Sequence, residues 1–141
     1  MRSIFAAALL AVLPIVAHAE TFEVEMLNGN ATGGMAFEPD FVSLKPGDTV
    51  KFLATQRGHN AATIKDFLPE GATPFKGKIN QEIEVTFTEE GFYGIMCTPH
   101  YDMGMVMVVR VGDTPLTKMK LPEDVRPGAV RRIEKIVERN Q

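Results

Sequence analysis

The sequence contains few of the residues that form disulfides or bind transition metals. Among 141 residues there are one cysteine and three histidines, and tryptophan is absent. A single cysteine cannot form an internal disulfide. Cys97 is therefore an intermolecular bridge, an exposed reactive thiol, an inert buried side chain or a metal ligand.

Long apolar runs and an excess of basic residues are also missing. The apolar stretch from Ile4 to Val16 is broken by Pro14, and it is shorter than the roughly 20 residues that a membrane-spanning helix needs. Lysine and arginine number 15 against 18 acidic residues, for a net charge of −3. Bulk charge of this sign does not indicate nucleic-acid binding. We expect neither nucleic acid nor a membrane among the partners.

The amino-terminal residues have the pattern of an export signal. Arg2 precedes the apolar stretch, and Ala17-His18-Ala19 follows it with small residues on either side of a variable one. This order is typical of a cleaved secretory signal peptide. We predict a signal peptide over residues 1–19, cleaved after Ala19. Cleavage removes His18 and leaves only His59 and His100.

Alternation of apolar and polar residues predicts short strands from residue 21 to residue 111. It is clearest over residues 81–88, where every second side chain is apolar. Strands at this spacing, without a helical period between most of them, indicate an antiparallel sandwich or barrel. We assign residues 20–112 to this sandwich and expect residues 55–80 to form a long surface excursion with one helical turn.

The last part of the chain, residues 113–141, has a different pattern. Apolar residues recur at three- and four-residue spacing from Val130 to Val137, with charged residues between them. This predicts an amphipathic helix that begins near Pro127, because proline is favoured at the first helical position. Its charges are of mixed sign, which argues against a helix that lies on a membrane. We expect the helix to pack on the sandwich.

The only cysteine lies close to a histidine and two methionines. Cys97, His100 and Met105 fall within nine residues, between strands predicted at 92–96 and 105–111, and His59 lies upstream in a Gly-His-Asn sequence. Two imidazoles, a thiolate and a weak axial thioether are the ligand set of a blue-copper electron-transfer site. The pattern therefore predicts one copper ion bound by these four residues.

Two details of this run affect the site. Met103 competes with Met105 as the axial ligand, and we favour Met105 because it leads directly into a strand that can hold it. Pro99 has no amide hydrogen and cannot donate to the Cys97 sulfur, whereas the backbone amide of Asn60 can. Taken singly, each of these residues fits an ordinary core or surface role. The combination favours the metal site.

The mature chain resembles the small cupredoxins and, within them, the pseudoazurins, over essentially all of its length. The resemblance rests on these segments: Phe22-Glu23-Val24, Met26-Leu27-Asn28, Phe37-Glu38-Pro39, Pro46-Gly47-Asp48-Thr49-Val50, Lys51-Phe52, Gly58-His59-Asn60, Thr63-Ile64-Lys65, Lys78-Ile79-Asn80, Val85-Thr86-Phe87-Thr88, Cys97-Thr98-Pro99-His100-Tyr101 and the trailing amphipathic helix.

This resemblance implies an all-β, cupredoxin-like Greek-key sandwich of about eight strands with a C-terminal helical extension. It implies one type 1 copper ion, cycling between Cu(I) and Cu(II), near one end of the sandwich. It further implies a monomeric periplasmic electron carrier without catalytic residues. Such a carrier receives electrons from an upstream donor and passes them to copper nitrite reductase or another reductase of denitrification.

The resemblance also implies that redox partners dock around His100. An apolar patch would comprise Met35, Pro99, Met103 and Ile95, and a basic ring would comprise Arg57, Lys65, Lys76 and Lys78. Such a ring would steer an acidic partner. Two residues depart from the pseudoazurin pattern: Met96 stands where lysine is frequent, and Asp102 stands where glycine is usual.

Three other functions use parts of the same pattern. A copper carrier or buffer would use the same ligands to deliver the metal. A reductase domain would need an open coordination position, and no ligands remain for a second metal. A secreted binding domain would hold zinc at Cys97 or no metal, because one thiolate and two imidazoles can also bind zinc.

Overall fold

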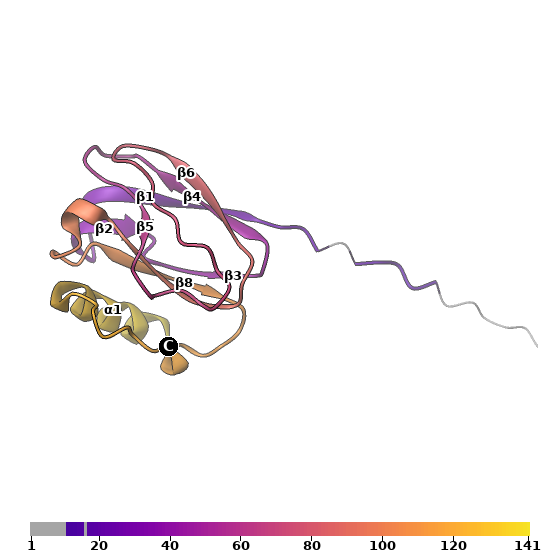
Figure 1. Cartoon of the computed structure of the whole chain (residues 1–141). Coiled ribbons are helices and arrows are strands. Elements are labelled where there is room, and N and C mark those ends of the chain that lie inside the picture. Colours follow the sequence, from indigo (N-terminus) through magenta and orange to yellow (C-terminus); the bar gives the residue numbers. More distant parts are fainter. Residues whose placement is uncertain (1–10, 16) are drawn as a thin grey trace, which may run out of the picture.

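The computed structural model of the chain describes residues 11–15 and 17–141. The expected signal peptide lies partly outside these residues, and its described part forms no helix or strand. This part runs away from the folded body as an extended segment (Figure 1). Among the described residues, no helix is long and apolar enough to cross a membrane.

Two four-stranded sheets make up the body of the described chain (Figure 1). One sheet has the strand order β2-β1-β4-β6 and the other has the order β3-β8-β7-β5. The strands are β1 (Thr21–Asn30), β2 (Gly33–Glu38), β3 (Phe41–Leu44), β4 (Asp48–Leu53), β5 (Ala62–Thr63), β6 (Ile83–Phe87), β7 (Gly91–Met96) and β8 (Val106–Val111). The expected sandwich of about eight strands is confirmed.

The expectation of purely antiparallel pairing was wrong. β1 pairs in parallel with β4, and β3 pairs in parallel with β8, so both sheets are mixed. Alternation along a strand tells which face is apolar, but it carries no information about the direction of the neighbouring strand. Each parallel pair joins strands that are not consecutive in the chain, as in a Greek key.

The main core lies between the two sheets. Val50 and Phe52 of β4 point into it, and Tyr93 and Ile95 of β7 face them from the other sheet. Cys97 and Met105 belong to the same buried cluster, near one end of the sandwich. The packing that stabilises the sheets therefore also encloses the proposed ligands.

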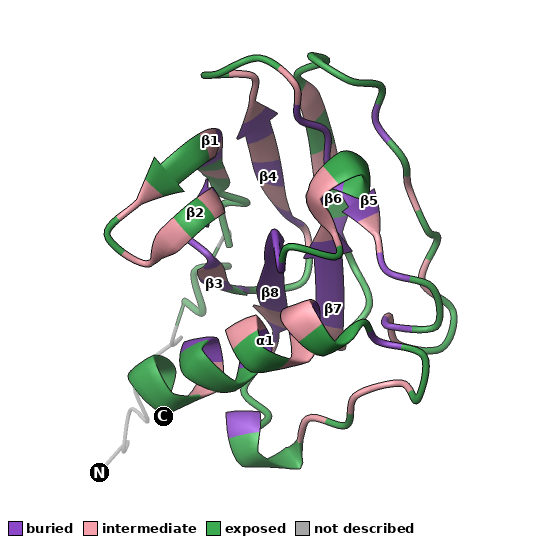
Figure 2. Cartoon of the chain, turned by 90° about the vertical axis from the view of Figure 1, so that its left-hand side faces the viewer, coloured by how far each residue is buried: buried purple, intermediate pink, exposed green. Residues whose placement is uncertain are grey.

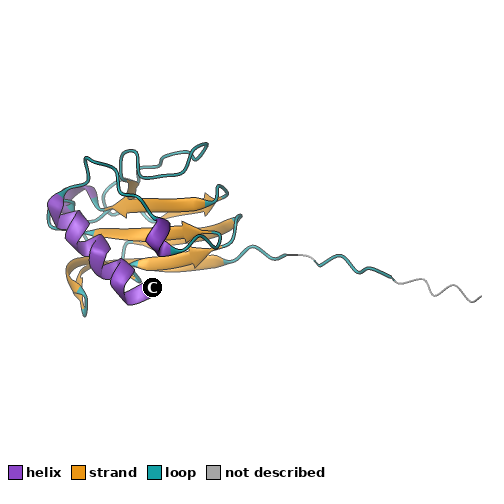
Figure 3. Ribbon diagram, turned by 90° about the horizontal axis from the view of Figure 1, so that it is seen from below, coloured by secondary structure: helices purple, strands orange, loops and turns teal. Residues whose placement is uncertain are grey.

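A second core lies between the outer face of the β3-β8-β7-β5 sheet and the C-terminal helix α1 (Pro127–Asn140). Ala129, Ile133 and Ile136 are the buried residues of α1, and they share this core with Val106 and Val108 of β8. Figures 2 and 3 show α1 crossing the strands of this sheet. The expected helix, its start at Pro127 and its packing on the sandwich are confirmed.

The connection between β4 and β6 differs from its expectation. Residues 55–80 contain no helical turn. Instead, this segment contributes the two-residue strand β5, which pairs with β7 through Ala62 and Met96. A strand of two residues is too short to show the alternation of apolar and polar side chains by which strands are predicted. A short 3₁₀ turn, η2 (Leu116–Lys118), lies between β8 and the C-terminal helix.

Candidate metal centre

His59 lies in the segment that follows β4, and its side chain is fully buried. Its Nε2 is 2.8 Å from Oδ1 of Asn28, which lies in β1. Because that amide oxygen can only accept, Nε2 carries the hydrogen and Nδ1 keeps its lone pair. The hydrogen bond therefore fixes the ring with Nδ1 as the metal-binding atom.

The other imidazole and the thiol come from the loop between β7 and β8. Cys97 follows β7 directly, and His100 ends the 3₁₀ turn η1 (Thr98–His100). The Cys97 Sγ lies 3.6 Å from His59 Nδ1 and 3.5 Å from His100 Nδ1. The candidate ligand atoms of these three residues all lie within 4.8 Å of one another. The fold thus brings His59 next to two donors that lie far from it in the sequence.

Met105 is fully buried, whereas Met103 is 61% exposed. The backbone of Met105 is held on both sides, because its carbonyl accepts from the Cys97 amide at 3.0 Å and its amide donates to the His100 carbonyl at 3.1 Å. Met105 lies one residue before β8 rather than inside it. Burial and fixed backbone favour Met105 over Met103 as the axial thioether.

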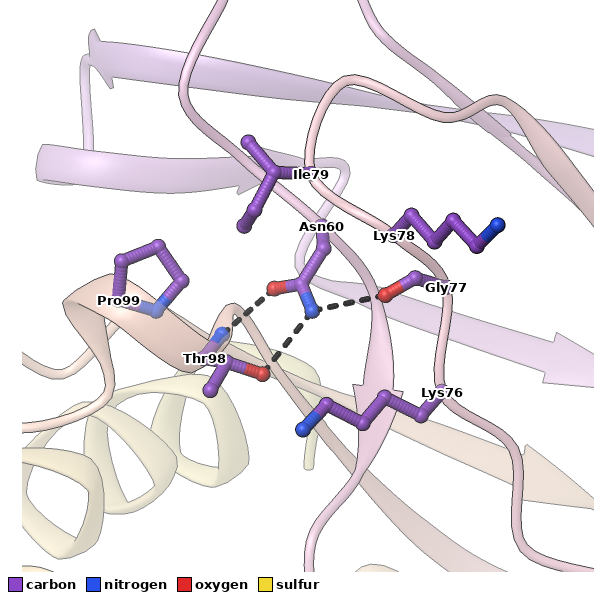
Figure 4. A pocket seen from close by; sticks show the side chains of 7 residues that line it. All are labelled: Asn60, Lys76, Gly77, Lys78, Ile79, Thr98 and Pro99. Atoms are coloured by element: carbon purple, nitrogen blue, oxygen red, sulfur yellow. Dashed lines mark hydrogen bonds between the residues drawn. The ribbon is translucent and has the colours of Figure 1, made fainter.

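The side chain of Asn60 joins the two segments that supply the ligands (Figure 4). Its Oδ1 accepts from the Thr98 amide at 2.7 Å, and its Nδ2 donates to Thr98 Oγ1 at 2.9 Å and to the Gly77 carbonyl at 3.0 Å. Asn60 follows His59, and Thr98 follows Cys97. These bonds therefore hold the first histidine next to the thiol.

Burial sets the ionisation of the donors. It raises the pKa of the Cys97 thiol, while hydrogen bonds from the backbone amides of Asn60 and His100 act in the opposite direction. The amide of Asn60 is the donor that the sequence indicated. Burial, together with the charge of His100, lowers the pKa of His59. The imidazole is therefore kept neutral, and a metal ion must displace the thiol proton when it binds.

The donor set fits copper. A soft thiolate and thioether suit Cu(I), and imidazoles suit both oxidation states. Three of the donors, His59, Cys97 and Met105, are fully buried, whereas His100 is half-buried.

The surface around His100 agrees only in part with the expected docking patch. Pro99 and Met103 are exposed, Met35 is half-buried, and His100 is itself half-buried. The expectation for Ile95 was wrong, because its side chain is fully buried in the core between the sheets. The run from Phe92 to Met96 is apolar on both strand faces, so the sequence does not show which residues reach the surface.

All four residues of the expected basic ring are exposed. Lys76 and Lys78 line a surface pocket of about 530 Å³ together with Pro99 and Ile79 (Figure 4). Asn60 and Thr98 also line it, so the pocket lies directly beside the loops that hold the ligands.

The two departures from the pseudoazurin pattern differ in their exposure. Met96 is half-buried and packs against the core under α1. Asp102 is exposed, and its carboxylate forms an ion pair with Arg126 at 3.4 Å. Part of the negative charge that Asp102 adds is therefore balanced locally.

Asn28 is the residue near the ligands that inspection of the sequence did not single out. It lies 31 residues before its partner His59. A polar residue near the end of a strand has the same pattern whether it faces water or a buried imidazole, so only the fold reveals the contact.

Comparison with known proteins agrees with this geometry. The family described as "Copper binding proteins, plastocyanin/azurin family" matches residues 24–112. A pseudoazurin of Paracoccus pantotrophus is 51% identical over 110 residues, which span 78% of this chain and 76% of the relative.

Two solved structures are similar over most of their length. The crystal structure of pseudoazurin from Methylobacterium extorquens AM1 has a TM-score of 0.74 and 40% identity, and the match covers 86% of this chain and 99% of that one. Native pseudoazurin from Hyphomicrobium denitrificans has a TM-score of 0.74 and 35% identity, with 84% and 97% covered.

Proposed function

This chain belongs to the plastocyanin/azurin family of copper-binding proteins and, within it, to the pseudoazurins, and from that membership we propose that it carries single electrons between proteins of the periplasm. The observation that carries the proposal is the convergence of one thiol and two imidazole Nδ1 atoms within 4.8 Å of one another. With the thioether of Met105, they form the ligand set of a type 1 copper site.

Copper bound at this site supplies a one-electron couple between its +1 and +2 states. The protein contributes ligands that are held in place and do not need to rearrange when copper changes its oxidation state. Asn28 holds the His59 ring, and Asn60 holds the Cys97 loop. His100 is the half-exposed ligand of the set, so its ring edge offers the shortest route between the site and a docked partner.

Burial favours electron transfer over copper delivery. Transfer of the metal to an acceptor would need exchangeable ligands, whereas Cys97 and Met105 are fully buried and joined through a backbone hydrogen bond of 3.0 Å. A carrier with enclosed ligands keeps its metal through many cycles.

The test is the visible spectrum of the purified protein after addition of Cu(II), with Cys97→Ser alongside. We expect an intense thiolate-to-copper charge-transfer band that ascorbate bleaches reversibly and that the variant lacks. Weak colour, or strong colour that survives the substitution, would show that Cys97 is not the ligand. Rapid loss of copper to a chelator without reversible voltammetry would instead indicate metal delivery.

Export to the periplasm is supported by the signal pattern that ends at Ala19. Val12, Leu13 and Ile15 of the segment before β1 are at least 81% exposed, so they add nothing to the core. We expect intact-mass analysis of the protein in a periplasmic extract to give a first residue of Glu20. Retention of the apolar segment there would contradict cleavage.

The proposed partners are an upstream electron donor and, as acceptor, copper nitrite reductase or another reductase of denitrification. Docking around His100 is supported by the exposed side chains of Pro99 and Met103 and by the lysines of the adjoining pocket. Stopped-flow mixing of the reduced protein with purified copper nitrite reductase should show oxidation at a rate that rises with reductase concentration. No oxidation by any denitrification reductase would exclude this partner class.

A further inference from the structure

The amino-terminal half of α1 packs against the loop that carries three of the proposed ligands. The Gly128 carbonyl oxygen lies only 2.6 Å from the position that a Cβ on Gly104 would take. The Arg126 amide donates to the Tyr101 hydroxyl at 3.4 Å. The backbones of the helix and of the loop are in contact here, so a side chain at Gly104 or at Gly128 would clash. The helix therefore lies directly against the turn between His100 and Met105.

Arg132, one turn further along α1, reaches the other half of the site. Its Nη2 donates to the Gly34 carbonyl at 2.7 Å and its Nη1 donates to the Met35 carbonyl at 3.4 Å, both in β2. The Arg132 Cβ lies 3.6 Å from the Cβ position of Gly104. One side chain thus links the β1–β2 hairpin to the ligand loop.

The stretch of β2 that Arg132 holds has an unusual backbone. Met35 has φ 49°, a left-handed conformation that non-glycine side chains rarely adopt and that persists only where the surroundings impose it. The half-buried guanidinium offers two charged donors to consecutive carbonyls, and such bonds are stronger than neutral ones. Among the described residues, Arg132 is thus the one whose side chain holds the carbonyls of Gly34 and Met35.

Across the hairpin, this stretch of β2 faces the residue that orients His59. The register runs from Leu27 opposite Ala36 to Gly29 opposite Gly34, so Asn28 lies opposite Met35. Asn28 Oδ1 accepts from His59 Nε2 at 2.8 Å. A change in the backbone at Met35 would therefore move the acceptor that sets the His59 ring.

We propose that Arg132 is a positioning residue of the copper centre, which holds the β1–β2 hairpin so that Asn28 keeps His59 in its metal-binding orientation. The proposal rests on the proposed function, since it assigns His59 as a ligand. It gives the C-terminal helix a role in setting the geometry of the site in addition to covering the sheet.

The first test uses the metal-free protein and so does not depend on copper. The hydrogen on His59 Nε2 should give a slowly exchanging imidazole signal in proton–nitrogen NMR, because it is buried and bonded to Asn28. Arg132→Gln should speed its exchange with water about tenfold, the scale of one charge-assisted hydrogen bond lost from the hairpin. Arg132→Lys, which keeps the charge but not the paired donors, should fall between the two.

The control is Arg139→Gln, which removes the same charge from the same helix. Arg139 binds the buried carboxylate of Asp40 at 3.2 and 2.7 Å, away from the ligands, so its loss should lower the melting temperature without speeding exchange at His59. Equal exchange in wild type and Arg132→Gln, or equally faster exchange in both variants, would overturn the proposal.

The second test uses the copper-loaded protein. Arg132→Gln should lose copper to a chelator about tenfold faster than wild type and change the intensity ratio of its visible bands, and Arg139→Gln should do neither. If wild type fails to bind copper, the proposed function fails, while the NMR test still decides whether Arg132 positions His59. Unchanged copper loss and bands in Arg132→Gln would overturn the positioning role.

Discussion

At the scale of single residues, two asparagines hold the proposed ligands in place. Asn28 fixes the ring of His59, and Asn60 joins the loop after His59 to the loop after Cys97. Partners of this kind set the tautomer and orientation of a ligand. Because these hydrogen bonds restrain the side chains and loops of the site, a change of oxidation state need not move the donors far.

The first prediction concerns the sulfur of Cys97. Pro99→Ala adds an amide hydrogen two residues after the cysteine, in the exposed turn η1. A further hydrogen bond to the thiolate favours the reduced state, in which the sulfur carries more negative charge. The reduction potential should rise by about 60 mV if the new bond favours reduction tenfold. Voltammetry measures the change.

Pro115→Ala is the matched control for this prediction. Pro115 is exposed and precedes η2, so its replacement should leave the potential as in wild type. An unchanged or lower potential in Pro99→Ala would mean that the new amide does not reach the sulfur.

The sequence was sufficient to single out the proposed ligands that the fold brings together, because the chemistry of such a site is visible in residue type and spacing. Cys97, His100 and Met105 lie in one short loop, and His59 is the only other histidine after residue 18. It was not sufficient for Asn28, Arg132 or the burial of Ile95. Those depend on which segments are neighbours in the folded chain, and the pattern of apolar and polar residues along a single segment does not encode that.

At the scale of elements, β8 and α1 depend on each other. Met107 and Val109 of β8 face the core between the sheets, whereas Val106 and Val108 face α1. A strand that is apolar on both faces needs cover on both sides, and the sequence supplied both the apolar strand and the amphipathic helix. The parallel pairs were not predictable, because they join residues that are far apart in the sequence, such as Thr21 of β1 and Thr49 of β4.

The second prediction tests the contribution of α1 to stability. Ile133 of α1 is 1% exposed, and its side chain packs in the core between the helix and β8. Ile133→Ala should lower the free energy of unfolding by about 2–5 kcal/mol, because truncation of a buried aliphatic side chain loses its transfer energy and leaves a cavity. Urea denaturation followed by circular dichroism measures it.

Lys135→Ala serves as the comparison, because Lys135 is exposed on the same helix and should change stability by no more than about 0.5 kcal/mol. If both substitutions cost the same small amount, α1 would not be part of the cooperative fold.

At the scale of the whole molecule, net charge and local charge have opposite signs. The chain carries a net charge of −3, yet the pocket beside the ligand loops is lined by Lys76 and Lys78 and by no acidic residue. Because salt screens charges over about 10 Å at 0.1 M, a partner at the surface responds to these lysines more than to the total. The acidic composition is therefore compatible with an acidic partner.

The third prediction uses a small anionic oxidant, hexacyanoferrate(III), as the probe of this local field. Lys76→Gln and Lys78→Gln should each slow oxidation of the reduced protein about two- to fivefold at low ionic strength, the scale of an exposed charge pair. Lys45→Gln removes the same charge from the exposed turn before β4 and should have little effect, because Lys45 lies beyond the opposite end of that strand from His59.

The differences should vanish near 1 M salt, where the screening length falls to about 3 Å. Stopped-flow absorbance at the charge-transfer band gives the rates. If all three variants slow the reaction equally, the oxidant responds to net charge, and electrons leave the protein without using a basic docking face beside His100.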